Sequence, residues 1–392
     1  MILSGSVPFF QSSYSPCLYT LLRWLDPVVS ITLAFIVSAI STLLLLRFNY
    51  LHLRHSGDSP GAGIQKFHTT SVPRIGGVGI LVGLTAGVIV QGYNALSLSL
   101  FGLSLIGVLL PGFLSGLAED LTKRVRPSAR LFATSCSASL GGLFLGAWLT
   151  RVDIASIDQL LLGAPMGIVF TCFAVSGVAH AFNLIDGFNG LASMVGILAL
   201  LGLAYVAYIV GDRPLLIISL TSVGAIAGFV VWNYPRGLIF LGDGGAYLIG
   251  LLIAELAILL VVRNPAVSAW FPLMLVFYPV LETLFSICRR IVLGRKHPGL
   301  PDAAHLHQLI YRRVVRWAVG TDALEASVKK NSMTSPYLWL LASVAVVPAV
   351  WFWSNTLVLQ LTALLFMVLY LSLYVAIAGS RFPRWLRRRR QR

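Results

Sequence analysis

Charged side chains are scarce in this chain of 392 residues. Asp, Glu, Lys and Arg make up only 11% of it, while 57% of the residues are hydrophobic. The mean hydropathy is +0.85. This composition excludes a protein that buries a single core in water, and it favours one that is dissolved in lipid.

Cysteine is also rare. The four cysteines, Cys17, Cys136, Cys172 and Cys288, form no Cys-x-x-Cys pair. This spacing argues against a cysteine metal site and favours core positions. No internal repeat and no separate soluble domain is visible. Residues 1–26 lack a basic leader region, so we expect an exterior N-terminal segment and no cleaved signal peptide.

Long apolar runs dominate what is present. A bilayer core about 30 Å thick needs about 20 apolar residues of helix to cross it. Eleven segments meet this test: 27–46, 76–96, 97–117, 131–149, 160–179, 190–210, 214–232, 244–262, 269–288, 335–354 and 356–379. The prediction is an all-α, polytopic integral membrane protein with one multi-span domain at 27–379. It includes a cytoplasmic loop at 289–334 and is followed by a basic cytoplasmic tail at 380–392.

The basic residues supply an orientation, because Lys and Arg accumulate in cytoplasmic loops. With a cytoplasmic C-terminus, eleven spans place 25 of the 29 basic residues inside. Only Arg23, Arg151, Arg213 and Arg263 fall outside, so we expect an exterior N-terminus. Since these bases flank the spans, the net charge of +15 favours contact with anionic membrane lipids and argues against nucleic acid.

The few acids gather on one side of this topology. Glu119 and Asp120 end the third span, Asp186 follows the fifth, Asp243 precedes the eighth, and Asp302 lies in the long loop. A metal or phosphoryl-transfer site needs such convergence. The exterior acids carry no motif, and we expect them only to be solvated. They are Asp26, Asp153, Asp158 and Asp212.

Three motifs hold the inside acids, and each also has a plainer interpretation. LSGLAEDLTKRVRPSARL (114–131) places two carboxylates side by side, and they repel one another unless a cation offsets their charge. The plainer interpretation is a charged helix end. HAFNLIDGFNGLA (180–192) offers amides and a carboxylate beside two glycines, or it is a capped loop. In NYPRGLIFLGDGGAYLIG (233–250), Asp243 is either a helix cap or a magnesium ligand beside phosphates.

Two basic motifs lie on the same predicted face. KFHTTSVPRIGGVGI (66–80) brings Lys66, His68 and Arg74 to a span end, as headgroup anchors or as ligands of an anion. RKHPGLPDAAHLHQLIYRR (295–313) carries several histidines among four bases. Its His-x-His pair suggests zinc, yet no cysteine or third spaced ligand supports this, and binding of a diphosphate fits better.

Two glutamates lie inside predicted spans, where ionisable groups are costly and often functional. Glu282 is close to the cytoplasmic end of its span and could extend its carboxylate to the surface. For Glu255 the sequence offers no explanation.

Taken in order, these motifs resemble the polyprenyl-phosphate N-acetylhexosamine-1-phosphate transferases of glycosyltransferase family 4, relatives of the phospho-MurNAc-pentapeptide translocase. The resemblance covers about 66–313, through PRIGG, the acidic pair, NLIDGFNGLA, FLGDGG and the histidine loop. It implies an enzyme of the bacterial inner membrane with its active site on the cytoplasmic face. Such an enzyme depends on Mg²⁺, with Mn²⁺ as an alternative ion. It moves a sugar 1-phosphate from a UDP-sugar onto undecaprenyl phosphate and releases UMP.

The resemblance also implies roles for single residues. Asp243 looks like the metal ligand, and Asn183 and Asp186 like residues that hold the diphosphate and the metal surroundings. Glu119 and Asp120 occupy the acidic pair, one of which is a candidate base, although a phosphate monoester with a second pKa of about 6 does not need one. Substrate binding falls to the remaining polar residues of the motifs: Lys66, His68, Arg74, Asn189, His305 and His307.

Three departures from the family pattern matter. Glu119 stands where the pair is usually Asp-Asp, and Asn189 stands where DGxDG has its second Asp. The loop reads HLHQ where the peptidoglycan branch has a longer run of His, so with PRIGG it favours the branch that initiates cell-envelope polysaccharides such as O-antigen. UDP-GlcNAc is the favoured donor, ahead of UDP-FucNAc and UDP-QuiNAc. The oligomeric state, a homo-oligomer included, stays open.

Two other classes of function compete with this interpretation. A secondary transporter or lipid flippase would place its polar groups near the midplane, in broken helices. A scaffold anchored by its basic tail would not need carboxylates at several helix ends.

Overall fold

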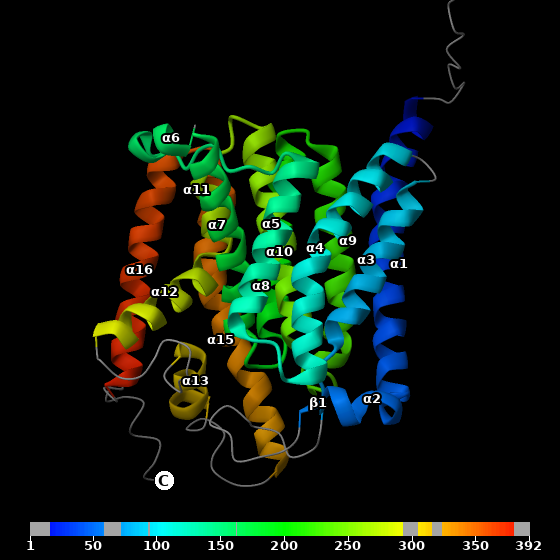
Figure 1. Ribbon diagram of the computed structural model, residues 1–392, viewed down its shortest axis with the longest axis vertical. Coiled ribbons are helices and arrows are strands. Elements are labelled where there is room, and N and C mark those ends of the chain that lie inside the picture. The colour runs from blue at the N-terminus through cyan, green and yellow to red at the C-terminus, as the bar shows by residue number, and fades with distance from the viewer. Residues whose placement is uncertain are drawn as a thin grey trace, which may run out of the picture.

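The computed structural model describes residues 16–58, 72–92, 95–161, 163–292, 305–315 and 324–379. They form a bundle of helices with one small antiparallel sheet, which confirms the predicted helical architecture (Figure 1). The helices are α1 (Pro16–Arg47), α2 (Asn49–Ser56), α3 (Gly76–Gln91), α4 (Leu96–Thr122), α5 (Pro127–Leu145), α6 (Ala155–Leu161), α7 (Ala164–Ile185), α8 (Leu191–Ile209), α9 (Arg213–Asn233), α10 (Gly242–Arg263), α11 (Trp270–Leu275), α12 (Phe277–Val292), α13 (Leu306–Leu309), the π-helix η1 (Ile310–Val315), α15 (Leu324–Trp351) and α16 (Thr356–Ala378). The strands are β1 (Gly57–Asp58) and β2 (Val72–Pro73).

Eight of the described helices are long and apolar enough to cross a membrane. They are Pro27–Arg47 of α1, α4, α7, α8, α9, α10, Asn331–Trp351 of α15, and α16. At the three other predicted spans the structure has α3, which is only 16 residues long, α5, and a segment that breaks at Val276 into α11 and α12. The chain is thus a multi-pass membrane protein, while the count of eleven and the orientation of its ends stay predictions.

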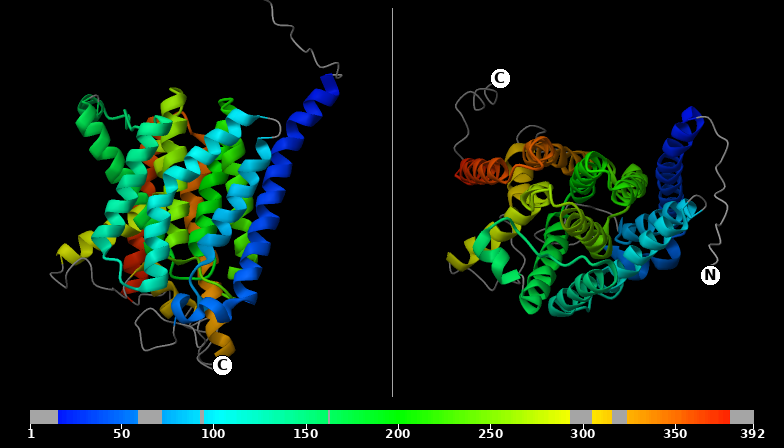
Figure 2. Two further views of the ribbon diagram at one scale, coloured as in Figure 1. Left: turned by 45° about the vertical axis from the view of Figure 1, so that its right-hand side comes forward. Right: turned by 90° about the horizontal axis from the view of Figure 1, so that it is seen from above.

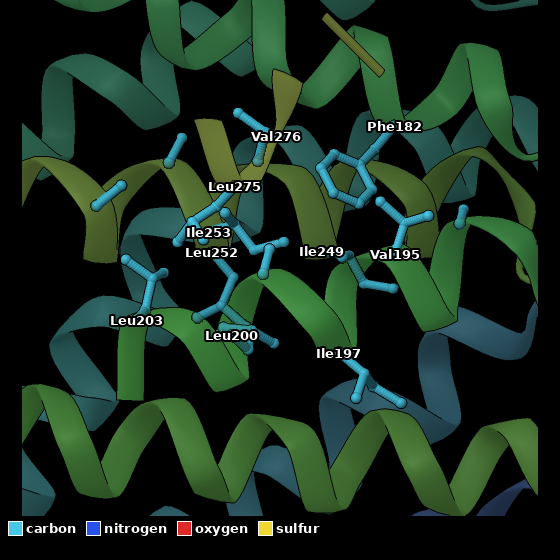
Figure 3. Packing of buried hydrophobic residues seen from close by; sticks show 14 of the residues in the cluster. Phe182, Val195, Ile197, Leu200, Leu203, Ile249, Leu252, Ile253, Leu275 and Val276 are labelled. Carbon is cyan, nitrogen blue, oxygen red and sulfur yellow. The ribbon is translucent and has the colours of Figure 1, made fainter. Parts of the chain in front are cut away.

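Helix α10 lies at the centre of the bundle. Every residue from Gly242 to Val261 is buried, and the helix contacts α3, α4, α5, α7, α8 and α9 (Figure 2). Figure 3 shows Ile249 and Ile253 of α10 packed among Phe182 of α7 and Leu200 of α8. A helix that is apolar on all its faces has to be enclosed by others. Its first turn is therefore a rigid platform for the side chains that it carries.

Three backbones meet at the start of α10. A Cβ atom on Gly116 of α4 would lie 2.5 Å from the backbone nitrogen of Gly244. A Cβ on Gly77 of α3 would overlap the Cα of Gly245. The glycines of FLGDGG therefore allow the backbones of α3 and α4 to approach α10 closely. The sequence did not indicate this role.

Three of the four predicted exterior acids are not merely solvated, so that expectation was wrong for them, while the side chain of Asp26 lies outside the described residues. Asp153 accepts three hydrogen bonds and pairs with Arg151 at 2.7 Å. Its three donors are Ser268 Oγ at 2.9 Å, the Ala269 nitrogen at 2.8 Å and Thr356 Oγ1 at 3.0 Å. Asp158 accepts from the Val152 nitrogen at 2.6 Å, and Asp212 caps α9 through the Leu215 nitrogen at 3.3 Å. Loop and helix-end N–H groups need such acceptors when no backbone partner is available.

Helix α12 leaves the bundle sideways (Figures 1 and 2). The side chains of Leu284, Ile287 and Val292 are exposed along it, as expected for a helix that meets lipid. Cys288 is also exposed, so its predicted core position was wrong. The predicted loop 289–334 contains helical structure: α13, η1 and the first turns of α15.

Candidate active site

Three of the five carboxylates that were predicted to converge, Asp120, Asp186 and Asp243, meet at the first turn of α10. The Asp186 carboxylate faces the N–H of Gly242, which favours its charged form. The two oxygens of Asp120 accept from the N–H groups of Asp243 and Gly244, at 3.0 Å each. Two successive N–H groups that a helix N-terminus leaves free are thereby satisfied, and their positive dipole faces negative charge. Asp120 and Asp186 thus fix the backbone that carries the Asp243 side chain.

Two guanidinium groups bind the carboxylate of Asp243. Arg74 donates from Nη2 to Oδ1 at 3.1 Å, and Arg130 donates from Nη1 to Oδ2. Arg74 also lies 3.7 Å from Asp120 through its Nε atom. Arg130 was not predicted as a site residue. Its only sequence signal is its position in the first turn of the helix that follows the acidic pair.

The segment before α3 holds Arg74 in place by backbone pairing. The Arg74 nitrogen donates to the Ser56 carbonyl at 3.0 Å, and the Phe240 nitrogen donates to the Pro73 carbonyl at 2.9 Å. Gly242 follows with a φ of +77°, and a Cβ there would overlap the carbonyl oxygen of Arg74. Only glycine is free of strain in this conformation, so the PRIGG and FLGDGG motifs fold as one unit.

Burial, together with neighbouring negative charge, raises the pKa of Asp186 to about 7. Loss of hydration on burial is the main cause, the carboxylates of Asp243 and Asp120 add to it, and Arg74 opposes it. Three carboxylates facing two guanidiniums leave an excess of negative charge. Asp186 therefore holds a proton part of the time near neutral pH, and a bound cation would displace that proton.

The loop after Asp186 is tied to α15. The Asn189 nitrogen donates to Asn331 Oδ1 at 2.9 Å, and its carbonyl accepts from Ser335 Oγ at 2.6 Å. The side-chain amide of Asn189 donates to the Pro235 carbonyl at 3.1 Å, and the residue is 5% exposed. An Asp could not donate this bond. Asn189, predicted to bind substrate, is therefore placed as a residue that positions the loop.

The histidine loop rests on a buried carboxylate. Glu282 of α12 accepts from His305 Nδ1 at 3.0 Å, from the Leu306 nitrogen at 3.2 Å and from the Tyr370 hydroxyl at 2.8 Å. Glu282 is 1% exposed, so the interpretation that its carboxylate reaches the surface was wrong. It is instead the anchor of the histidine loop, which its place one helix before the loop could have suggested.

His305 and His307 are stacked, with ring centroids 5.3 Å apart and planes 3° apart. His307 also meets Phe188 edge to face at 5.6 Å, beside Gly187. The structure thus brings the histidine loop against the loop that follows Asp186. Burial lowers the pKa of His307 to about 4, so this ring is neutral at neutral pH and can bind an anion only as a hydrogen-bond donor.

The other predicted site residues either make contacts of their own or lie outside the described residues. Glu119 accepts from the Val125 nitrogen at 2.8 Å, in the turn after α4, and does not share the Asp120 contacts. Asn183 lies in the last turn of α7, half-buried, and its carbonyl accepts from the Asp186 nitrogen at 3.3 Å. Four predicted residues lie outside the described part of the chain: Lys66, His68, His297 and Asp302.

The described residues contain no group of three or more His, Cys, Asp or Glu side chains arranged to hold a metal ion. Phosphoryl-transfer sites commonly bind Mg²⁺ by one or two carboxylates together with substrate phosphates and water, without a complete protein cage. Asp243 and Asp186 supply oxygen ligands of the kind that Mg²⁺ prefers. This donor set fits an ion that arrives with a diphosphate, although each Asp243 oxygen is now bound by a guanidinium.

Known proteins are similar in sequence to this chain. Residues 76–261 match the profile of glycosyl transferase family 4. A probable undecaprenyl-phosphate N-acetylglucosaminyl 1-phosphate transferase of Bacillus subtilis is 24% identical over 90% of this chain and 94% of its own length. An undecaprenyl-phosphate alpha-N-acetylglucosaminyl 1-phosphate transferase of Thermotoga maritima is 28% identical over 64% of this chain and 72% of its own. A decaprenyl-phosphate N-acetylglucosaminephosphotransferase of Mycobacterium tuberculosis is 27% identical over 63% and 69%. The chain belongs to glycosyl transferase family 4 through residues 76–261, the segment that carries Asp120, Asp186 and Asp243.

Proposed function

We propose that this protein transfers N-acetylglucosamine 1-phosphate from UDP-N-acetylglucosamine to undecaprenyl phosphate and releases UMP. The observation that carries the proposal is the Asp243 carboxylate, held between Arg74 and Arg130 on a helix N-terminus that Asp120 and Asp186 fix. Two guanidinium groups that converge on one point of a fixed helix end suit a diphosphate. The names of the relatives supply the sugar and the acceptor.

The proposed reaction is a displacement at phosphorus. An oxygen of the acceptor phosphate attacks the β-phosphorus of the donor, and the bond between that phosphorus and the oxygen bridging to UMP breaks. Several negative charges meet in this step, so the protein has to position and neutralise them. Arg74 and Arg130 can exchange Asp243 for phosphate oxygens, because guanidinium binds both with similar geometry.

We further propose that Asp243, with Asp186 beside it, holds Mg²⁺, and that Mn²⁺ can replace it. A bound divalent cation neutralises charge on the donor diphosphate. Its arrival would also offset the excess of carboxylate charge at the start of α10. The site would face the cytoplasm across the inner membrane, and the product would begin a lipid-linked glycan for a cell-envelope polysaccharide.

A transporter or flippase is the alternative function, and the described side chains give it little support. The carboxylates of the site lie at helix ends. Glu255, within α10, faces Gly141 of α5, and its carboxylate has no hydrogen-bond partner among the described residues. A single isolated acid does not make the continuous polar pathway that transport needs.

The proposal is tested by UMP release from purified protein in lipid nanodiscs supplied with undecaprenyl phosphate, Mg²⁺ and a panel of UDP-sugars. We expect release with UDP-GlcNAc and loss of at least about 99% of it when EDTA removes the metal. Restoring Mg²⁺ should recover the rate. Absence of UMP with every UDP-sugar, in protein that still binds a UDP-sugar, would contradict the proposed reaction.

Glu282→Ala should lower kcat/KM for UDP-GlcNAc about tenfold to a hundredfold, because the histidine loop loses its anchor and small misplacements of binding groups are costly. Tyr370→Phe removes only one of the three hydrogen bonds and should stay within about threefold of the wild type. Binding of UMP, which lacks the transferred group, should change less than about twofold. Equal losses in UMP and UDP-GlcNAc binding would show that Glu282 supports the whole site and not the histidine loop alone.

A further inference from the structure

A series of neighbouring side chains leads from Asp243 into the bundle. Arg130, which pairs with Asp243, also lies beside the hydroxyl of Tyr247. That hydroxyl lies 3.4 Å from His180 Nδ1, and the Tyr247 and His180 rings are 4.9 Å apart. The four residues come from α5, α7 and α10, so they converge only in the folded protein. The contact of Arg130 Nη1 with Asp243 belongs to the positions assigned above to the donor diphosphate, whereas Arg130 Nε, Tyr247 and His180 are not used there.

Among these four side chains, two nitrogens are buried without a hydrogen-bond partner among the described residues. They are Arg130 Nε and His180 Nε2. The first always carries a proton. We assign the Tyr247 hydroxyl as the donor to His180 Nδ1, so the neutral ring carries its proton on Nε2. Both nitrogens are therefore N–H donors without an acceptor. Buried donors of this kind are rare in folded proteins and call for an acceptor, which here would be an anionic oxygen.

This group lies deeper in the bundle than the carboxylates. His180 precedes Asp186 by six residues on α7, and Tyr247 follows Asp243 by four on α10, which places them about 9 Å and about 6 Å further from the helix ends. A water-soluble nucleotide approaches from those ends. The phosphate of a lipid acceptor lies at the membrane interface, with its apolar chain alongside the helices.

The outer surfaces of the same helices are apolar. Next to Arg130 on α5, Leu131 is 50% and Phe132 is 72% exposed, and Phe173 on α7 is 71% exposed. Large exposed apolar side chains are what a helix presents to lipid tails. The unpaired N–H donors of Arg130 and His180 thus lie on helices whose other faces meet the membrane. The polyprenyl chain of a lipid acceptor would lie there.

We propose that Arg130, His180 and Tyr247 form the subsite for the phosphate monoester of the polyprenyl acceptor. The proposal rests on the proposed transferase function and adds the place where the acceptor phosphate binds. Arg130 and His180 each donate to a phosphate oxygen, while Tyr247 orients His180. Arg130 also joins this subsite to Asp243, so the acceptor phosphate lies beside the donor diphosphate.

The test compares variants in KM for each substrate. His180→Phe keeps the ring volume and removes the donor, and it should raise KM for undecaprenyl phosphate about tenfold or more, with KM for UDP-GlcNAc within about twofold. His180→Gln keeps an N–H donor and should recover most of the loss. Tyr247→Phe should act on the same KM, and the double variant should lose less than the product of the two single effects. Tyr205→Phe, on an exposed part of α8, is the matched control and should behave as wild type.

A second measurement does not depend on turnover. Binding of undecaprenyl phosphate to nanodisc-held protein without UDP-sugar should weaken about tenfold in His180→Phe, and inorganic phosphate should compete for the same site only at far higher concentration. An increase in KM for UDP-GlcNAc instead of the acceptor, or unchanged lipid binding in His180→Phe, would overturn the subsite. If the wild type bound the lipid phosphate through His180 but released no UMP, the subsite would stand and the proposed reaction would fail.

Discussion

Asp243→Asn should lower the rate of UMP release at least about a thousandfold. The amide matches the carboxylate in size, and the backbone contacts of Asp120 with the Asp243 and Gly244 nitrogens do not involve the changed side chain. What is lost is the negative charge that faces Arg74 and Arg130 and that is proposed to hold Mg²⁺. The loss should therefore appear in turnover and in the Mg²⁺ requirement.

Donor binding should respond differently from turnover. With residue 243 neutral, the two guanidiniums no longer have their shared partner and are available to the donor diphosphate. Calorimetry without metal should therefore find UDP-GlcNAc bound to Asp243→Asn as tightly as to the wild type, or more tightly. Weaker metal-free binding in the variant would show that the arginines are not free to move to phosphate.

Asp212→Asn is the matched control for this substitution. Asp212 caps α9 through the Leu215 nitrogen, and an amide oxygen can accept the same hydrogen bond. Its turnover should stay within about twofold of the wild type. If Asp243→Asn kept more than about a tenth of wild-type turnover, the role of Asp243 as the metal ligand would have to be abandoned.

The sequence predicted which helix ends would carry the site, because sidedness is a property of topology. Once the basic residues oriented the chain, Asp120, Asp186 and Asp243 fell on one face, and the structure brings them to the first turn of α10. Most long apolar runs were also found as membrane-length helices, since length and hydropathy decide this almost alone. The broken segment around Val276 was missed, although Pro272 and Pro279 stand on either side of it in the apolar run and are residues at which helices break.

The role of each polar residue could not be predicted, because it depends on which group faces it. Asn189 was noted only as the position where the family motif has an Asp, yet its amide is needed to donate to the Pro235 carbonyl. Glu282 was expected to reach the membrane surface and Arg130 was only counted among the cytoplasmic bases, since the sequence does not show that His305 and Asp243 lie opposite them. Such partners are far apart in the chain and become neighbours only through helix packing.

Asp120→Asn should reduce turnover about a hundredfold through the position of Asp243 and not through loss of a base. Both Asp120 oxygens accept N–H groups at 3.0 Å and the residue is 1% exposed, so the carboxylate is bound to the backbone and shielded from a substrate. In the variant, an amide NH₂ would face one of those N–H groups. Losing a hydrogen bond to a charged acceptor costs about 1.5–3 kcal/mol, and the first turn of α10 should shift to relieve the clash.

The Mg²⁺ dependence separates these two roles for Asp120. A displaced Asp243 binds the metal less well, so the half-saturating Mg²⁺ concentration should rise in Asp120→Asn, whereas loss of a base alone would leave it unchanged and alter only the pH profile of kcat. Glu119→Gln is the adjacent control, because an amide oxygen can still accept from the Val125 nitrogen, as Glu119 does at 2.8 Å. Its turnover should remain within about threefold of the wild type. A loss in Glu119→Gln as large as that in Asp120→Asn would mean that the two carboxylates act as a chemical pair, since nothing in the contacts of Glu119 connects it to the start of α10.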